Sequence, residues 1–213
     1  MCGRYALYTT NEINDRYHVK GSGALRASYN VAPSQVMPVV TSDGLHLMRW
    51  GLIPPWARDE KIGYRLINAR SETVFDKPMW KKPIMQRRCL IPANGFYEWQ
   101  KRGDGKHPYF VHLKDEQLFS FAGIWETWRH EGKIWETYSI LTTTPNKDVD
   151  AIHDRMPVIL HRDDEAQWLA ADNEQDIAVL LRPYGDGKIE AYEVGTEVNT
   201  VRVNDEGLIR PIG

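Results

Sequence analysis

Residues 118–141 read LFSFAGIWETWRHEGKIWETYSIL, the strongest secondary-structure signal in the chain. Two runs rich in aromatic and β-branched residues, 118–124 and 134–141, flank the turn-like sequence Arg129-His130-Glu131-Gly132. Such runs on either side of a glycine-containing turn predict a β-hairpin. Residues 109–113 have the same composition and predict a further strand just before the hairpin.

The helices expected from the sequence are short and peripheral, and each begins beside a side chain that can cap it. Three are predicted: one opened by Thr9 and Glu12 and running to about His18, one capped by Asp163 over residues 164–171, and one capped by Asn173 with Asp176 and ending before Pro183. Short strands with a few surface helices predict an α+β fold. We therefore expect a single domain over residues 1–213, with an antiparallel, barrel-like β core and peripheral helices.

The overall composition is that of a soluble globular protein. The 213 residues include 27 Lys and Arg and 29 Asp and Glu, giving a net charge of −2, and 42% are hydrophobic. No apolar stretch approaches the roughly 18 residues that a membrane span needs, and Arg4, Glu12 and Asp15 interrupt any signal-like run at the N-terminus. A cytoplasmic protein with no membrane partner is expected.

The charge is unevenly distributed along the chain. Residues 1–110 carry 17 basic and 9 acidic side chains, whereas residues 111–213 carry 10 and 20. The basic half also contains four of the tryptophans, Trp50, Trp56, Trp80 and Trp99. Cations interleaved with aromatic rings suit a groove that neutralises phosphates and stacks unpaired bases. The alternative is that these tryptophans are core residues, since Trp is usually largely buried.

Cys2 would become the first residue if the initiator methionine is removed, as a small second residue normally permits. A cysteine at that position carries an α-amine, of pKa about 7.7–8.0, beside a thiol of pKa about 8.5. An aldehyde can condense with the amine to an imine, onto which the thiol closes a five-membered thiazolidine. The alternative is that Cys2 is merely a small residue at the chain end. The other cysteine, Cys89, lies in an apolar run and is expected to be a buried structural thiol.

A series of short motifs follows Cys2 in order along the chain. They are MCGRY (1–5), YNVAP (29–33), WGLIPPW (50–56), NARSE (68–72), RCLIP (88–92), GFYEW (95–99) and HDRMP (153–157). Together they resemble the SRAP (SOS-response-associated peptidase) family of abasic-site processing proteins. The resemblance implies a DNA-damage protein that joins Cys2 to the open-chain sugar aldehyde of an abasic site in single-stranded DNA. The resulting thiazolidine cross-link would remove the imine that promotes strand cleavage.

The resemblance also implies roles for three further catalytic residues. Glu98 would lie beside Cys2 and move protons during ring opening, imine formation and reversal. His153 is a second acid–base candidate, because imidazole titrates near neutral pH. Asn68 would hold the sugar aldehyde through its amide. Each has a structural alternative: an outward-facing strand carboxylate, a structural histidine with a surface ion pair between its neighbours Asp154 and Arg155, and a turn asparagine.

The proposed DNA contacts are of two kinds, phosphate-binding and base-packing. Guanidinium groups can grip phosphates with two hydrogen bonds, and rings can pack on an unpaired base. The candidates are Arg4, Pro33, Trp56, Arg70, Trp99 and, more weakly, Thr142. The sequence contains neither a metal-ligand pattern nor a glycine-rich phosphate loop, so neither metal nor cofactor is expected. We expect a monomer that joins the nucleoid on damage, if the source is bacterial.

Two other function classes remain open from the sequence. Glutamine amidotransferase domains also begin Met-Cys-Gly and use the freed cysteine as nucleophile, although they resemble a different, four-layer fold. A non-covalent single-strand-binding module, in which Cys2 is incidental, is the second. The peptidase label could refer to self-removal of Met1 or to a true protease activity.

Overall fold

Five strands of the computed structural model, which describes residues 2–20 and 25–212, close into a barrel. They are β3 (Val36–Thr41), β4 (Gly44–Trp50), β6 (Arg88–Ala93), β9 (Phe119–His130) and β10 (Lys133–Thr143). The pairing order is β10-β4-β3-β6-β9, and the pairing of β9 with β10 closes the ring. The predicted barrel-like core is confirmed, with one difference: β10 runs parallel to β4.

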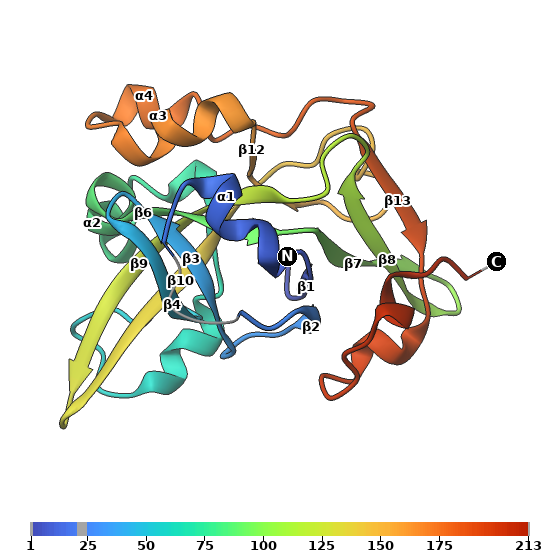
Figure 1. Cartoon of the computed structure of the whole chain (residues 1–213), viewed down its shortest axis with the longest axis horizontal. Coiled ribbons are helices and arrows are strands. Elements are labelled where there is room, and N and C mark those ends of the chain that lie inside the picture. Colours follow the sequence, from blue (N-terminus) through green and yellow to red (C-terminus); the bar gives the residue numbers. More distant parts are fainter. Residues whose placement is uncertain (1, 21–24, 213) are drawn as a thin grey trace.

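The predicted hairpin is the pair β9 and β10, and it projects from the lower left of the molecule in Figure 1. His130 pairs with Lys133, leaving a two-residue turn at Glu131 and Gly132. Both turn residues have positive φ, 46° and 77°. A turn of this kind matches the right-handed twist of the strands it joins, and Gly132 adopts its conformation without steric cost.

A second, open sheet lies beside the barrel and contains the N-terminal strand. Its order is β13 (Ile189–Glu193), β8 (Gly105–Leu113), β7 (Gly95–Arg102), β1 (Tyr5–Leu7) and β2 (Ser28–Val31). Three short strands extend the barrel sheet: β5 (Asn68–Arg70) beside β10, β11 (Met156–Pro157) beside β10, and β12 (Ile159–Leu160) beside β9. The predicted strand at residues 109–113 is the second half of β8.

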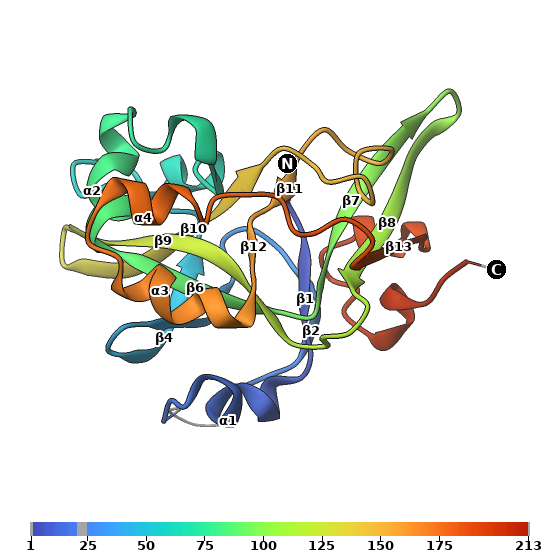
Figure 2. The same cartoon turned by 90° about the horizontal axis from the view of Figure 1, so that it is seen from above.

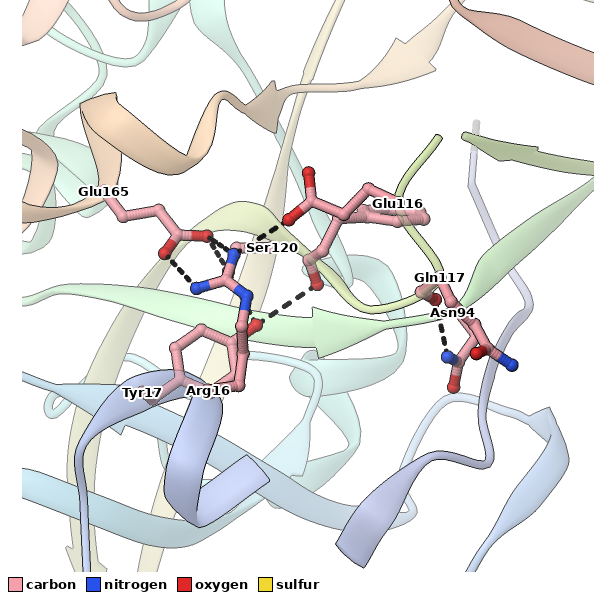
Figure 3. A network of polar contacts seen from close by, with 8 residues as sticks. Arg16, Tyr17, Asn94, Glu116, Gln117, Ser120 and Glu165 are labelled. Carbon is pink, nitrogen blue, oxygen red and sulfur yellow. Dashed lines mark hydrogen bonds and ion pairs between the residues drawn. The ribbon is translucent and has the colours of Figure 1, made fainter. Parts of the chain in front are cut away.

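Asn94 marks the point where the chain leaves the barrel at the end of β6 and enters the open sheet as β7. Its Oδ1 accepts from the backbone amides of Tyr8 (2.6 Å) and Thr9 (3.1 Å). Its Nδ2 donates to Thr9 Oγ1 (2.7 Å) and to the carbonyl of Gln117 (2.6 Å), and the Gln117 contact is drawn in Figure 3. One buried side chain therefore fixes three segments at the junction of the two sheets.

The helices are short and lie outside the sheets (Figures 1 and 2). They are α1 (Ile13–Tyr17), α2 (Pro78–Gln86), α3 (Glu165–Ala170) and α4 (Glu174–Ala178). The 3₁₀ turns are η1 (Thr10–Glu12), η2 (Glu60–Arg65), η3 (Ser71–Thr73), η4 (Arg162–Asp164), η5 (Thr196–Asn199) and η6 (Glu206–Ile209).

The three predicted helices are present, but two of the expected caps are wrong. The Thr9 hydroxyl accepts from Asn94 rather than capping α1, because Thr9 is buried at the sheet junction. Asp163 lies inside η4, so α3 begins at Glu165. Asn173 does cap α4, accepting from the Asp176 amide at 2.9 Å. Helix α2, which begins with proline at its first position, was not predicted.

Arg16 fastens α1 to α3 through charged contacts. Figure 3 shows its guanidinium between Glu165 and Glu116, with Nη1 and Nη2 each 2.9 Å from a Glu165 oxygen and Nη2 3.1 Å from Glu116 Oε1. Ser120 Oγ donates to Glu165 Oε1 at 2.7 Å. These contacts hold the N-terminal segment against the barrel after it has passed through the open sheet. Among the described residues, we find no helix long and apolar enough to cross a membrane.

Candidate functional site

The N-terminal segment lies where the barrel and the open sheet meet, and Cys2 is fully buried there. Its Sγ donates to the carbonyl of Arg4 at 3.7 Å. Burial raises the pKa of the Cys2 thiol far above its usual range, and the Glu98 carboxylate raises it further. The ordinary thiol pKa of about 8.5 assumed from the sequence therefore does not hold for this buried state, because desolvation disfavours the anion. A reaction at this sulfur needs a group that accepts its proton.

Glu98 lies on β7, where the strand passes beside the N-terminal segment, and only 1% of the residue is exposed. Burial raises the pKa of its carboxyl group from 4.5 to about 7. The outward-facing alternative is wrong, since this strand position points into the protein. A buried carboxyl that titrates near neutrality can both donate and accept protons under working conditions.

His153 lies on the loop between β10 and β11, and its Nε2 is 3.7 Å from Glu98 Oε2. Its Nδ1 accepts from the backbone amide of Arg155 at 3.0 Å and is 3.0 Å from Asp154 Oδ1. Partial burial lowers the pKa of His153. Glu98 therefore holds a proton more readily, and His153 less readily, than the same groups do in water, because the pKa of the first is raised and the pKa of the second is lowered.

Asn68 is the first residue of β5, which pairs with β10 of the barrel. Its Nδ2 donates to the backbone carbonyl of Cys2 at 2.8 Å, which ties the N-terminal segment to the barrel. Its buried Oδ1 has no hydrogen-bond partner among the described residues. The amide therefore orients the backbone that carries the reactive residue and leaves an acceptor available for an incoming donor.

Arg155 connects the segments around the site through a buried guanidinium. It pairs with Glu72 through both terminal nitrogens, and its Nη2 donates to the carbonyl (2.7 Å) and Oγ1 (3.2 Å) of Thr142. Its own amide holds His153. Arg155 therefore pairs with Glu72, whose side chain is partly exposed, and not with Asp154 as the structural alternative had it. Thr142 is itself fully buried in β10, where it pairs with Arg70 of β5.

The other predicted DNA contacts lie in different settings. Arg70 is exposed at the end of β5, and Trp56 is 64% exposed after the Pro54-Pro55 turn. Arg4 is tied internally, since its Nη1 donates to Asn30 Oδ1 (2.8 Å) and the carbonyl of Val198 (3.1 Å). Trp99 is partly exposed, and its Nε1 donates to Asn199 Oδ1 at 2.8 Å.

Pro33 is partly buried and follows β2, next to Ser34, whose amide donates to the carbonyl of Trp50. The bond places the YNVAP and WGLIPPW motifs side by side. The other tryptophans of the basic half, Trp50 and Trp80, are 1% and 4% exposed and belong to the core, as the structural alternative expected.

A cleft of about 590 Å³ opens beside Glu98 and His153. Its lining includes Trp99 and three residues that the sequence did not single out: Lys101, Lys106 and Asn199. The two lysines lie near the turn of the β7–β8 hairpin, where residues 101 and 106 pair. Their basic character was visible in the sequence, but their position over the cleft depends on the hairpin register. Among the described residues, no group of three His, Cys, Asp or Glu side chains could hold a metal ion.

Comparison with known proteins adds a family and several relatives. The model of the family described as SOS response associated peptidase (SRAP) matches residues 1–201. Abasic site processing protein YoaM of Bacillus subtilis is 46% identical over 98% of this chain and 97% of its own length. Abasic site processing protein HMCES of Gallus gallus is 34% identical over 89% of this chain and 68% of its own length.

Solved structures share the fold. A crystal structure of a protein from Bacteroides thetaiotaomicron superposes with a TM-score of 0.94 at 33% identity, covering 99% of this chain and all of that one. A protein from Bordetella bronchiseptica gives a TM-score of 0.79 at 25% identity, covering 91% of this chain and all of that one. The barrel and the open sheet are therefore a shared architecture.

Proposed function

Because the chain belongs to the SOS response associated peptidase (SRAP) family, whose curated relatives are named abasic site processing proteins, we propose that it captures abasic sites in single-stranded DNA through Cys2. The observation that carries the proposal is the cluster of Cys2, Asn68, Glu98 and His153 at the junction of the two sheets. An N-terminal aminothiol beside a titrating carboxyl group suits capture of an aldehyde.

The capture proceeds in two steps, imine formation and ring closure, after Met1, which lies outside the described residues, has been removed. The α-amine of Cys2 adds to the C1′ aldehyde of the open sugar, and loss of one water leaves an imine. The thiol sulfur then bonds to the imine carbon, while the thiol proton moves to the nitrogen. The product is a thiazolidine, and the net change is the loss of one water.

Glu98 is the proton carrier in these steps. The buried Cys2 thiol holds its proton tightly, so ring closure needs a nearby base. Water loss from the first adduct needs an acid, and a carboxyl group of pKa about 7 is present in both forms at neutral pH. His153, 3.7 Å from Glu98, exchanges protons with it and assists opening of the cyclic sugar.

Asn68 orients the reactive residue, and its unpaired Oδ1 accepts from a sugar hydroxyl. The DNA strand lies along the basic and aromatic residues around the cleft. Arg70 and Arg4 contact phosphate, Trp56, Pro33 and Trp99 pack on bases, and Thr142 supports Arg70 from within the sheet. The protein acts as a monomer of one domain in this proposal.

The test is intact-mass spectrometry under denaturing conditions after mixing the protein with a single strand bearing one abasic site. We expect one adduct, with the combined mass less one water, on the abasic strand and none on an undamaged strand. Cys2→Ala should abolish it, whereas Cys89→Ala, which removes the other buried thiol, should not. A residue added before Cys2 should also abolish the adduct, because it blocks the amine.

Failure to form the adduct with a confirmed free Cys2 terminus would overturn the proposal. Glutaminase activity that is lost in Cys2→Ala would then assign the chain to the amidohydrolase class. Selective binding of the abasic strand that is unchanged by Cys2→Ala would instead assign a non-covalent module. Release of Met1 by the protein itself, followed with Glu98→Gln as control, tests the peptidase activity.

A further inference from the structure

Two exposed aromatic side chains lie in the segment that leads from β4 to the site. Of the large hydrophobic side chains that stay exposed in the described part of the chain, only Trp56 and Tyr64 are aromatic, at 64% and 56%. Tyr64 lies on η2, four residues before Asn68. An aromatic ring that keeps one face open, in the segment that leads to Asn68, has the geometry needed to stack on an unpaired base.

One face of the Tyr64 ring packs on a buried cation, the guanidinium of Arg49. The Cζ atom of Arg49 lies 5.4 Å from the centroid of the Tyr64 ring and 5.9 Å from that of Trp135. Arg49 is only 7% exposed, and its buried Nη1 has no hydrogen-bond partner among the described residues. Two aromatic rings therefore hold the guanidinium, and within the same residues no acidic side chain forms an ion pair with it.

Two glycines allow this close arrangement. A Cβ atom on Gly63 would lie 2.7 Å from the carbonyl oxygen of Gly51 and 3.2 Å from Arg49 Nη1. A Cβ atom on Gly51 would lie 2.6 Å from the carbonyl oxygen of Gly63. Only glycine at both positions lets η2 pack against the residue that follows β4, so this contact fixes where the backbone of Tyr64 lies.

The charges around Tyr64 favour an anionic strand. Lys61 and Arg65 flank it on η2 and are exposed. The acidic residues of the segment have other contacts: Asp59 caps η2 by accepting from the Lys61 amide at 2.9 Å, and Glu60 lies 3.6 Å from Lys133 Nζ. A base stacked on Tyr64 would place its phosphates beside Lys61 and Arg65, for which no ion pair is found among the described residues.

We propose that the Tyr64 ring, stacked on Arg49, is a binding site for an unpaired base of the same strand, displaced from the abasic nucleotide. The inference rests on the proposed function and extends the strand path away from Cys2. In Figure 2, the segment between β4 and α2, the N-terminus and the tip of the β7–β8 hairpin all lie along the upper side of the molecule. The N-terminus lies between the other two. The strand therefore runs from the hairpin lysines past Cys2 to Tyr64. Tyr64 contacts the part of the strand on only one side, 5′ or 3′, of the abasic nucleotide.

The test is fluorescence anisotropy with single strands carrying a tetrahydrofuran abasic analogue, which lacks the aldehyde and reports binding alone. The strands are shortened stepwise on the 5′ or the 3′ side. Stacking on an aromatic side chain contributes enough that Tyr64→Ala should weaken binding about 5- to 150-fold on the long strand. Tyr64→Phe should stay within about twofold, because the ring is kept.

Two variants separate stacking from other effects. Tyr64→Leu keeps bulk without a π-face and should bind as weakly as Tyr64→Ala. Val179→Ala, which trims another exposed side chain, should bind like the wild type. The effect of Tyr64→Ala should vanish once the strand on one particular side of the abasic nucleotide is too short to reach η2.

Wild-type affinity of Tyr64→Ala on every strand, or of Tyr64→Leu on the long strand, would overturn the stacking site. An equal loss on strands shortened from either side would also overturn it. These outcomes are independent of the adduct. A wild-type protein that forms no adduct removes the proposed function, whereas one that forms the adduct but ignores Tyr64 removes only this inference.

Discussion

The closed barrel and the open sheet meet at Cys2, and they contribute different kinds of groups to the site. The open sheet carries Cys2, just before β1, and Glu98 on β7, the two groups that exchange protons and form bonds in the proposed reaction. The barrel carries Asn68, which holds the Cys2 carbonyl, and Thr142, which holds Arg155. The barrel has no free edge in its ring of five strands, whereas the open sheet ends at β2 and β13. In the proposed reaction the open sheet therefore supplies the bond-forming residue and the main proton carrier, whereas the barrel sheet holds them in position and adds His153 from the loop between β10 and β11.

The largest effect should come from Glu98, the proposed proton carrier on the open sheet. Glu98→Gln keeps the shape of the side chain but removes its titration, and general acid–base groups typically contribute about 10²- to 10⁴-fold. We expect adduct formation to slow by at least about 100-fold, measured by quenched gels over time. Affinity for a tetrahydrofuran strand should stay near that of the wild type. An unchanged rate would assign the proton transfers to another group.

The same carboxyl group should make the fold less stable as the pH rises. Its pKa is raised in the folded protein, from 4.5 to about 7, so the folded state binds more protons than the unfolded state between these values. Glu98→Gln should therefore match the wild type below about pH 4.5 and exceed its stability by about 3 kcal/mol above pH 7. Urea unfolding at several pH values measures this. A constant difference across that range would show that Glu98 titrates normally.

Arg155→Ala tests the positioning side, because it removes the guanidinium that joins Glu72 to Thr142. Hydrogen bonds to charged groups are strong, but Glu72 is partly exposed, so we expect a loss of about 2 kcal/mol in unfolding free energy. Adduct formation should also slow, since the loop carrying His153 is released. Arg155→Lys serves as the control and should recover only part of both losses, because lysine lacks the forked geometry. Full activity in Arg155→Ala would break the division between the two sheets.

Asn68→Ala should have a smaller effect, because it removes only neutral hydrogen bonds: one to the Cys2 carbonyl and, in the proposed complex, one from a sugar hydroxyl. Such bonds contribute about 1 kcal/mol each, which together corresponds to a rate of adduct formation lower by about 30-fold. The measurement is the single-turnover rate at saturating strand, with Asn173→Ala as a control for loss of an asparagine far from the site. A loss as large as that of Glu98→Gln would place Asn68 among the reacting groups.

The smallest effect should come from Arg70, exposed at the end of β5. Arg70→Ala should weaken binding of undamaged single strands slightly and reduce the salt slope by about 0.7, the value for one phosphate contact. Anisotropy titrations at several salt concentrations measure the slope. A slope equal to that of the wild type would remove Arg70 from the phosphate contacts.

The fold class and the hairpin could be predicted because their signals are local. Runs of aromatic and β-branched residues on either side of a glycine-containing turn sufficed for β9 and β10, and Asn173 was correctly predicted as a cap. Thr9 and Asp163 matched the same capping pattern, but Thr9 is used by Asn94 and Asp163 lies within η4. Tertiary contacts override local preference at those two positions.

The site residues were indicated by motifs, whereas their environments were not. The sequence could name Cys2 and Glu98, but only the meeting of two sheets buries both and changes their pKa values. Thr142 was considered a DNA contact, and the structure places it inside β10 against Arg155. Lys101 and Lys106 were missed because their approach to the cleft depends on pairing across the β7–β8 hairpin.

The two-residue turn at Glu131 and Gly132 has a practical consequence for handling the protein. The proposed chemistry requires a free α-amine at Cys2, so no affinity tag can precede it. The β9–β10 hairpin projects away from the junction of the sheets, and both turn residues are exposed. Biotin attached there would immobilise the protein on a surface with its reactive terminus free, which makes single-molecule observation of strand capture feasible.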